Sequence, residues 1–159
     1  MNHPSLTFRR PASRLLFLAA FLLAAIIPAR SQSIVGSWKR TANILEKSDG
    51  STTDMQKMLT KGRPCMADIL YVFEADGRQL TRLPKGCELP GMDDIADYTI
   101  SGATITLTSR GNKGPLGAIA AYTLAFKGNT VTLTHVYTAN EKATLHSKVA
   151  KLIMTYTRA

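Results

Sequence analysis

The strongest constraint on the fold of this chain is the run YTLAFKGNTVTLTH, residues 122–135, in which apolar and polar residues alternate on both sides of a Gly-Asn pair. If Gly128-Asn129 forms a two-residue hairpin loop, the alternation places all the large side chains on one face and the threonines on the other. A slip of one residue would scatter the apolar set over both faces. The inward pairs predicted by this register are Tyr122 with His135, Leu124 with Leu133, and Phe126 with Val131.

Two other turns give the same kind of pattern. Around Asp76-Gly77 the register predicts that Phe73 meets Leu80, with Tyr71 and Ile69 on the same face. Around Gly102 the residues predicted to share a face are Tyr98, Ile100, Ile105 and Leu107. With the runs at both ends of the mature chain, strands are predicted at 35–45, 68–74, 78–83, 97–101, 103–109, 117–127, 130–138 and 150–157.

A meander of eight strands with one apolar face has two unpaired edges. Closure into an up-and-down barrel removes both edges. We therefore predict an all-β fold, an eight-stranded antiparallel up-and-down barrel that side chains fill or that holds one small ligand.

One short helix is expected in the first connection between strands, over residues 49–61. Thr52 or Thr53 can cap it, and Gly62 ends it. The apolar residues at helical spacing are Met55, Met58 and Leu59. They are predicted to face the barrel opening as a lid, and the alternative is a fixed cover that buries part of the core.

Residues 1–31 have the features of a secretory signal peptide, which leaves residues 32–159 as one barrel domain. Arg9, Arg10 and Arg14 precede the apolar run 15–28, and small residues flank a cleavage point before Gln32. The apolar run is short for a membrane span, so no integral span is expected after its removal. An uncleaved N-terminal anchor is the alternative. Secretion or a periplasmic location is the expectation.

The division at residue 31 changes the net charge of the remaining chain and the expected state of its cysteines. Four of the 20 basic residues and none of the 11 acidic residues lie in the leader, so the remainder has 16 against 11 and a net charge of +5. These charges are scattered along the chain, Lys39 and Arg40 among them, and we interpret them as a solvated surface that does not bind nucleic acid. In an oxidising compartment, Cys65 and Cys87 are expected to form a disulfide that ties the loop after the third strand to the start of the second.

Several motifs resemble one family. Gly36-Ser37-Trp38 is similar to the G-x-W signature of lipocalins, and the spacing from Cys65 through Asp68 and Phe73 to Asp76-Gly77 resembles the lipocalin-like domains of exported Bacteroidota proteins. The resemblance covers residues 34–158. It implies a calyx for small apolar molecules, with Trp38 closing one end and Arg158 lying across its ring. Many such relatives are lipoproteins with a cysteine at the cleavage site, which this chain lacks.

The inward faces supply the candidate ligand-binding residues. Several tyrosines and a histidine among aliphatic side chains suit an apolar ligand with one polar group, although a packed core would use the same residues. The predicted ligand-binding residues are Tyr71, Tyr98, Tyr122, Leu124, Leu133, His135, Tyr137 and Met154. The polar head is expected at Tyr122, His135 and Tyr137, and an apolar tail towards Phe126, Val131 and Leu133.

No enzyme motif and no metal-ligand spacing is present in the sequence, so we expect no enzyme, no cofactor and no metal. A role for His135 as a haem ligand is a weaker interpretation than a structural role. The predicted function is an exported, monomeric lipocalin-like protein that binds a small hydrophobic molecule. The alternative is a protein-binding or inhibitory module that acts through its loops around a filled barrel.

Overall fold

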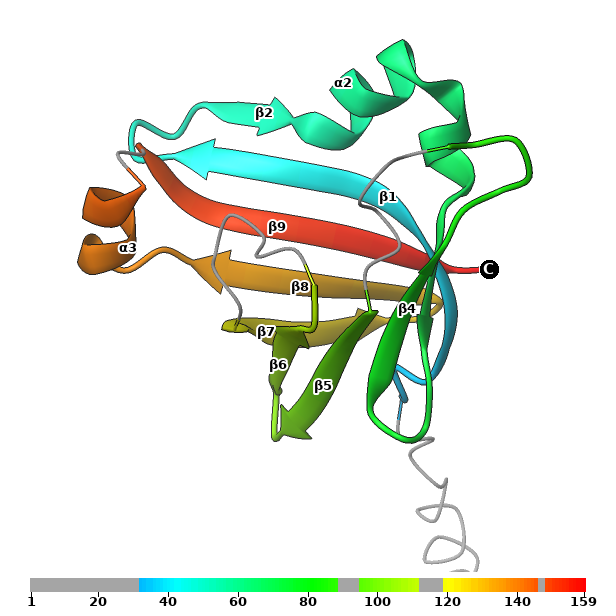
Figure 1. Cartoon of the computed structure of the whole chain (residues 1–159). Helices are drawn as coiled ribbons and strands as arrows, with labels where there is room; N and C mark the ends of the chain where they lie inside the picture. Colours follow the sequence, from blue (N-terminus) through cyan, green and yellow to red (C-terminus); the bar gives the residue numbers. More distant parts are fainter. Residues whose placement is uncertain (1–31, 89–94, 112–118, 146–147) are drawn as a thin grey trace, which may run out of the picture. The chain divides into compact units, whose positions relative to one another are not determined.

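The fold is that of a computed structural model, which describes residues 32–88, 95–111, 119–145 and 148–159. Residues 33–159 form one unit, and the predicted signal peptide lies outside the described residues. The elements in chain order are β1 (Gly36–Lys47), β2 (Thr52–Asp54), α2 (Met55–Gly62), η1 (Pro64–Asp68), β3 (Leu70–Phe73), β4 (Arg78–Arg82), β5 (Ile95–Ser101), β6 (Thr104–Ser109), β7 (Ile119–Lys127), β8 (Thr130–Val136), α3 (Ala139–Thr144) and β9 (Val149–Arg158) (Figure 1).

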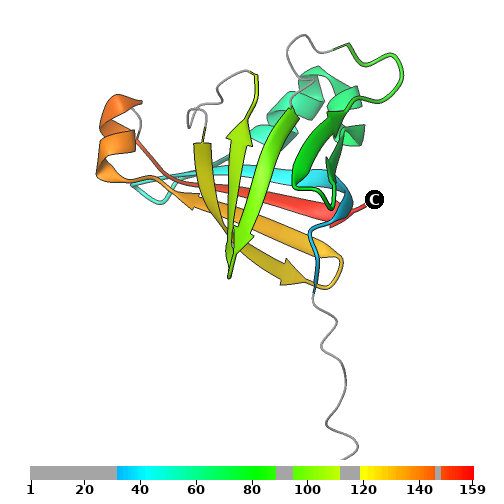
Figure 2. The ribbon, with the colours of Figure 1, turned by 60° about the horizontal axis from the view of Figure 1, so that its bottom comes forward.

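The sheet closes into a barrel. Each strand from β3 to β9 pairs antiparallel with the next, β1 pairs with β3, and β9 pairs back onto β1. Figure 2 shows the green strands lying across the cyan, red and orange strands as the sheet curls round. All eight predicted strands are confirmed, within the described part of the chain; the predicted start of the sixth, at residue 117, lies outside it. Closure gives each of the eight strands a neighbour on both sides, as the meander pattern required.

Strand β1 has two different neighbours along one of its edges. Its first residues, Gly36 to Lys39, pair with β3, whereas Ile44 to Glu46 pair with the three-residue strand β2, which the sequence did not predict. Between these two stretches the edge of β1 is bordered by α2, which lies beside β1 in Figure 1. Helix α2 is thus placed at a seam in the barrel wall, and its N-cap is Asp54 rather than either predicted threonine.

Two of the three predicted registers are confirmed. Leu124 pairs with Leu133 and Phe126 with Val131, as a two-residue loop at Gly128-Asn129 requires. Pairing of β5 with β6 matches Ile100 to Ile105 and Tyr98 to Leu107. In both hairpins a glycine with φ +57° begins the loop, a conformation in which glycine carries no steric penalty.

The predicted register of the β3–β4 hairpin is wrong by one residue. Phe73 pairs with Gln79 and Val72 with Leu80, so Gln79 takes the buried position predicted for Leu80. The loop contains three residues and not two, with Gly77 at φ +88° and a hydrogen bond from the Glu74 N–H to the Arg78 carbonyl, 2.8 Å. A three-residue loop of this kind ends in a left-handed glycine, and the added residue shifts the whole strand.

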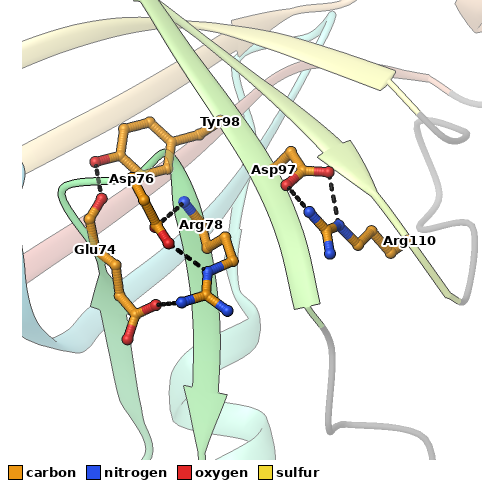
Figure 3. A network of polar contacts seen from close by, with 6 residues as sticks. All are labelled: Glu74, Asp76, Arg78, Asp97, Tyr98 and Arg110. Carbon is orange, nitrogen blue, oxygen red and sulfur yellow. Dashed lines mark hydrogen bonds and ion pairs between the residues drawn. The ribbon is translucent and has the colours of Figure 1, made fainter.

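Polar contacts hold this hairpin against β5 (Figure 3). The Arg78 side chain pairs with Glu74 at 2.9 Å and with Asp76 at 2.7 Å. The Tyr98 hydroxyl donates to the Glu74 carbonyl at 2.6 Å. Because the charged pairs are exposed, they contribute little to the free energy of unfolding, and the buried hydroxyl contact is the stronger constraint on the loop.

A second helix was not predicted. Helix α3 follows β8 and begins with a capping box, in which the Thr138 side chain accepts from the Glu141 N–H while the Glu141 carboxylate accepts from the Thr138 N–H. The T-x-x-E pattern that signals such a box is present in the sequence. The predicted strand to residue 138 overlooked it.

The disulfide between Cys65 and Cys87 is confirmed, with a Cα–Cα distance of 5.8 Å. Cys87 is buried with Met66 and Ile69 in a small apolar cluster, against which Leu59 of α2 packs. The bridge therefore joins η1 to the loop after β4, and the cluster around it also packs against α2. Among the described residues, no helix is long and apolar enough to cross a membrane.

Candidate functional site

Trp38 lies near the start of β1, at one end of the barrel, and is 1% exposed. Its Nε1–H donates to the Ile34 carbonyl at 2.6 Å, and the Arg158 guanidinium lies over its ring at 4.6 Å from the centroid. The predicted Trp38–Arg158 contact is confirmed. Gly36 has φ +133°, and a Cβ there would lie 2.9 Å from an Arg158 nitrogen. Glycine at this place allows the guanidinium to reach the backbone carbonyls of Ser33 and Val35.

The predicted interior residues are brought together on the inner face. The main core adds five residues that were not predicted: Ile34, Leu45, Ala120, Val149 and Leu152. The apolar inward residues predicted as ligand-binding are in or against this core: Tyr71, Tyr98, Tyr122, Leu124, Leu133, Tyr137 and Met154. They divide between the two ends of the barrel, because β8 begins beside the last residues of β9 at the Trp38 end and runs away from it.

The predicted polar group lies in the half away from Trp38. The ring of His135 contacts those of Tyr122 and Tyr137 edge to face, at 5.8 and 4.9 Å between centroids. His135 Nδ1 lies 2.8 Å from the Ala121 carbonyl, and Nε2 lies 3.1 Å from a Glu141 carboxylate oxygen. Nδ1 therefore has a hydrogen-bond partner, whereas Nε2 lies beside the carboxylate of Glu141, in the unpredicted helix α3, without the geometry of a hydrogen bond.

Burial changes the ionisation of these tyrosines. Desolvation, with a smaller contribution from Tyr137, raises the pKa of Tyr122 to about 12. Burial and the nearby Glu141 charge raise the pKa of Tyr137. Both hydroxyls remain protonated at neutral pH and can donate hydrogen bonds. Tyr98, in contrast, lies at the Trp38 end, where its hydroxyl holds the β3–β4 loop.

The predicted lid residues do not share one buried face. Met58 is 59% exposed, so its predicted position towards the barrel opening is wrong. Met55 is half-buried and Leu59 packs on the disulfide cluster. The buried residue of α2 is Gln56. The physical reason is that the barrel presents a polar group to the helix at this place, so a polar side chain fits there better than methionine.

That polar group is Arg40, which was predicted to belong to the solvated surface. Its Nε–H donates to Gln56 Oε1 at 2.9 Å, and its guanidinium lies 5.1 Å from the centroid of the Tyr71 ring. Tyr71 in turn contacts Tyr156 edge to face, and Tyr156 is 4% exposed. Alternation from the buried Trp38 places Arg40 on the inner face. The signal for this was available in the sequence, as Arg40 lies two positions after Trp38.

A bulge in β1 then changes which residues face inward. Arg40 pairs with Tyr156, but Ala42 pairs with Thr155, so Thr41 is an extra residue. The next inward positions are therefore Asn43, opposite Met154, and Leu45, opposite Leu152. The Asn43 Oδ1 atom is buried and has no hydrogen-bond partner among the described residues. Bulges re-aim side chains in this way, and simple alternation could not have predicted Asn43.

Comparisons with known proteins do not assign a family, since no protein-family model matches this chain and no curated protein matches its sequence. Within the described residues, no three His, Cys, Asp or Glu side chains gather as a metal site. The candidate site is therefore defined by its geometry alone. It is the inner face of the barrel, with polar groups at Tyr122, His135 and Tyr137 on one side and at Arg40 and Asn43 on another.

Proposed function

We propose that this chain is an exported lipocalin-like protein that binds a small apolar molecule inside its barrel, without catalysing a reaction. The observation that carries the proposal is the division of the inner face. Val131 and Leu133 are at most 1% exposed, whereas Tyr122 and Tyr137 bring protonated hydroxyls to the half away from Trp38. Binding sites for small molecules are mostly apolar with a few placed polar groups.

Other features support the relationship and the location. A G-x-W motif whose tryptophan is capped by Arg158 fits the lipocalin-like family. The Cys65–Cys87 bridge supports export, because disulfides persist in oxidising compartments. The signal-peptide features of residues 1–31 also support export. We expect the exported protein to be a monomer.

The test is binding of an uncharged fluorescent apolar probe to protein purified after expression of the full chain. Ala120 lies on the inner face opposite Leu107, and Ala121, its neighbour, is exposed. Ala120→Trp should fill the half of the interior away from Trp38 and weaken probe binding at least tenfold. Ala121→Trp adds the same ring outside and should leave binding unchanged.

A second pair of variants tests the deeper half. Leu133→Arg places an unpaired charge at a fully buried position and should abolish binding if the barrel still folds, which circular dichroism checks. Thr132→Arg, on the outer face of the same strand, is its control. Unchanged probe binding in folded Leu133→Arg and Ala120→Trp proteins would favour the alternative, a module that acts through its loops.

A further inference from the structure

Within the described part of the chain, the charge of Arg40 has no acidic partner inside the barrel. Other basic side chains in this part of the chain form ion pairs at exposed or half-exposed positions, such as Lys39 with Asp68 at 2.7 Å. Arg40, the next residue, instead contacts the amide of Gln56, the ring of Tyr71 and the hydroxyl of Tyr156. Arg40 is half-buried, and even partial removal of a guanidinium from water without a carboxylate partner is unfavourable. An anion in the barrel would remove that cost.

The surroundings of Arg40 also contain polar atoms with weak or missing partners. The Tyr156 hydroxyl donates to the Met154 thioether at 3.4 Å, and thioether sulfur is a weak acceptor. Burial raises the pKa of Tyr156, an effect that the charge of Arg40 and a hydrogen bond from it oppose. Asn43, the next inward residue of β1, has its buried oxygen without a partner among the described residues. A half-turn of this amide would present its NH₂ group instead.

These groups form one polar set on two paired strands. Arg40 lies opposite Tyr156 and Asn43 opposite Met154, so the guanidinium, the hydroxyl and the amide follow the β1–β9 pair along the inner face. All three can donate hydrogen bonds, and one is positively charged. The planar guanidinium matches the two oxygens of a carboxylate. The aliphatic core at Val131 and Leu133 lies beyond it, across β9 and β8.

We propose that the ligand is an apolar carboxylic acid whose carboxylate binds Arg40, with Tyr156 and Asn43 as further hydrogen-bond donors. This rests on the proposed function, since it names the class of molecule that enters the barrel. The head group lies at the β1–β9 pair beneath α2, and not at the Tyr122, His135 and Tyr137 group, where the Glu141 carboxylate already lies 3.1 Å from His135 Nε2 and would repel an acid. Gln56 binds the Nε–H of the guanidinium, and one hydrogen bond to the Tyr156 hydroxyl still leaves other N–H groups for the acid.

The test compares dodecanoate with dodecanol by calorimetric titration of protein purified after expression of the full chain. The two ligands share the chain and differ in the charged head group. The acid should bind about 10- to 100-fold more tightly, the usual effect of a hydrogen bond to a charged group. Equal affinities would overturn the inference while leaving the proposed function intact. Binding of neither ligand would instead contradict the proposed function itself.

Variants assign the preference to Arg40. Arg40→Met should remove the preference for the acid and keep dodecanol binding, whereas Lys39→Met removes the same charge from the outer face and should change neither affinity. Gln56→Glu keeps Arg40 but supplies a carboxylate beside it, so it should also lower the affinity for the acid. If Arg40→Met fails to fold, the Gln56→Glu result decides. Unchanged acid binding in folded Arg40→Met and Gln56→Glu proteins, or tighter binding of dodecyl phosphate than of dodecanoate, would overturn the inference.

Discussion

At the scale of single residues, the clearest link between sequence and structure is Gly36. Its φ of +133°, together with the 2.9 Å that would separate a Cβ at this position from an Arg158 nitrogen, disfavours a side chain here. The space left by glycine is what lets Arg158 lie over Trp38. The packing around Trp38 thus involves three residues, of which Gly36 and Trp38 are two apart in sequence and Arg158 is near the other end of the sequence.

Gly36→Ala should lower the free energy of unfolding by about 1–3 kcal/mol, because the backbone strain and the displaced guanidinium add together. Gly62→Ala is the control, since Gly62 has no positive φ and open space around it; that variant should be neutral or slightly more stable. Urea unfolding measures both. A Gly36→Ala protein as stable as the Gly62→Ala protein would contradict the role given to Gly36.

Tyr122 makes the stability sensitive to alkali. Its folded pKa of about 12 lies above the ordinary value of 10, so the folded state keeps the proton longer than the unfolded state. The stability from this group is therefore complete below pH 10 and is lost as the pH rises through 12, a change of roughly 2–3 kcal/mol. Tyr122→Phe should show a smaller loss over that range in urea unfolding.

Absorbance titration of the tyrosinate bands provides an independent check of the same shift. Of the five tyrosines, Tyr122 and Tyr156 should ionise last, because burial raises the pKa of each. Ionisation of all five near the ordinary value, before the protein unfolds, would contradict the burial described here.

At the scale of elements, the register of a hairpin was predicted correctly where its loop length could be inferred. Gly128-Asn129 and Gly102-Ala103 are two-residue loops, and their registers followed from alternation. The register predicted for the β3–β4 hairpin was wrong because Ala75-Asp76-Gly77 is compatible with a loop of two or of three residues. The flanking sequence does not strongly favour either loop length. Helix α2 was predicted in place, but its buried residue was not, because the polar partner Arg40 is reached only in three dimensions.

The disulfide stabilises the segment from η1 to the loop after β4. Cys65 and Cys87 are separated by 22 positions, and the loss of loop-closure entropy in the unfolded chain corresponds to about 3 kcal/mol. Replacing both cysteines with serine should lower the unfolding free energy by about that amount. The variant should then be insensitive to reductant, unlike the natural chain. An unchanged unfolding midpoint would show that the bridge does not constrain the unfolded chain.

Helix α2 should be less stable locally than the barrel strands. Gln56 is its only fully buried residue, and few buried apolar contacts imply low-energy local opening. Hydrogen exchange across 55–62 should be faster than in β8 and should slow when dodecanoate is bound. Gln56→Ala should increase exchange in the helix alone. Protection equal to β8 with and without ligand would make α2 a fixed cover.

At the scale of the whole molecule, the barrel was predictable because its sequence pattern is repeated along the chain. Each hairpin alone is ambiguous, but apolar faces on eight successive strands require closure. The candidate site was only partly predictable. Tyr122, His135 and Tyr137 follow from one register, and alternation from Trp38 places Arg40 on the inner face. The inward position of Asn43 instead depends on the bulge in β1, and the contact between Arg40 and Gln56 forms only in three dimensions.

The central claim is that the interior of the barrel is the binding site. Nuclear Overhauser effects between bound dodecanoate and assigned methyl groups test this most directly. Leu133 and Met154 face inward at the centre of the core, so their methyl protons should show contacts to the alkyl chain. Contacts confined to exposed methyl groups, such as those of Ile119 and Val136, or none at a saturating concentration of ligand, would contradict the account.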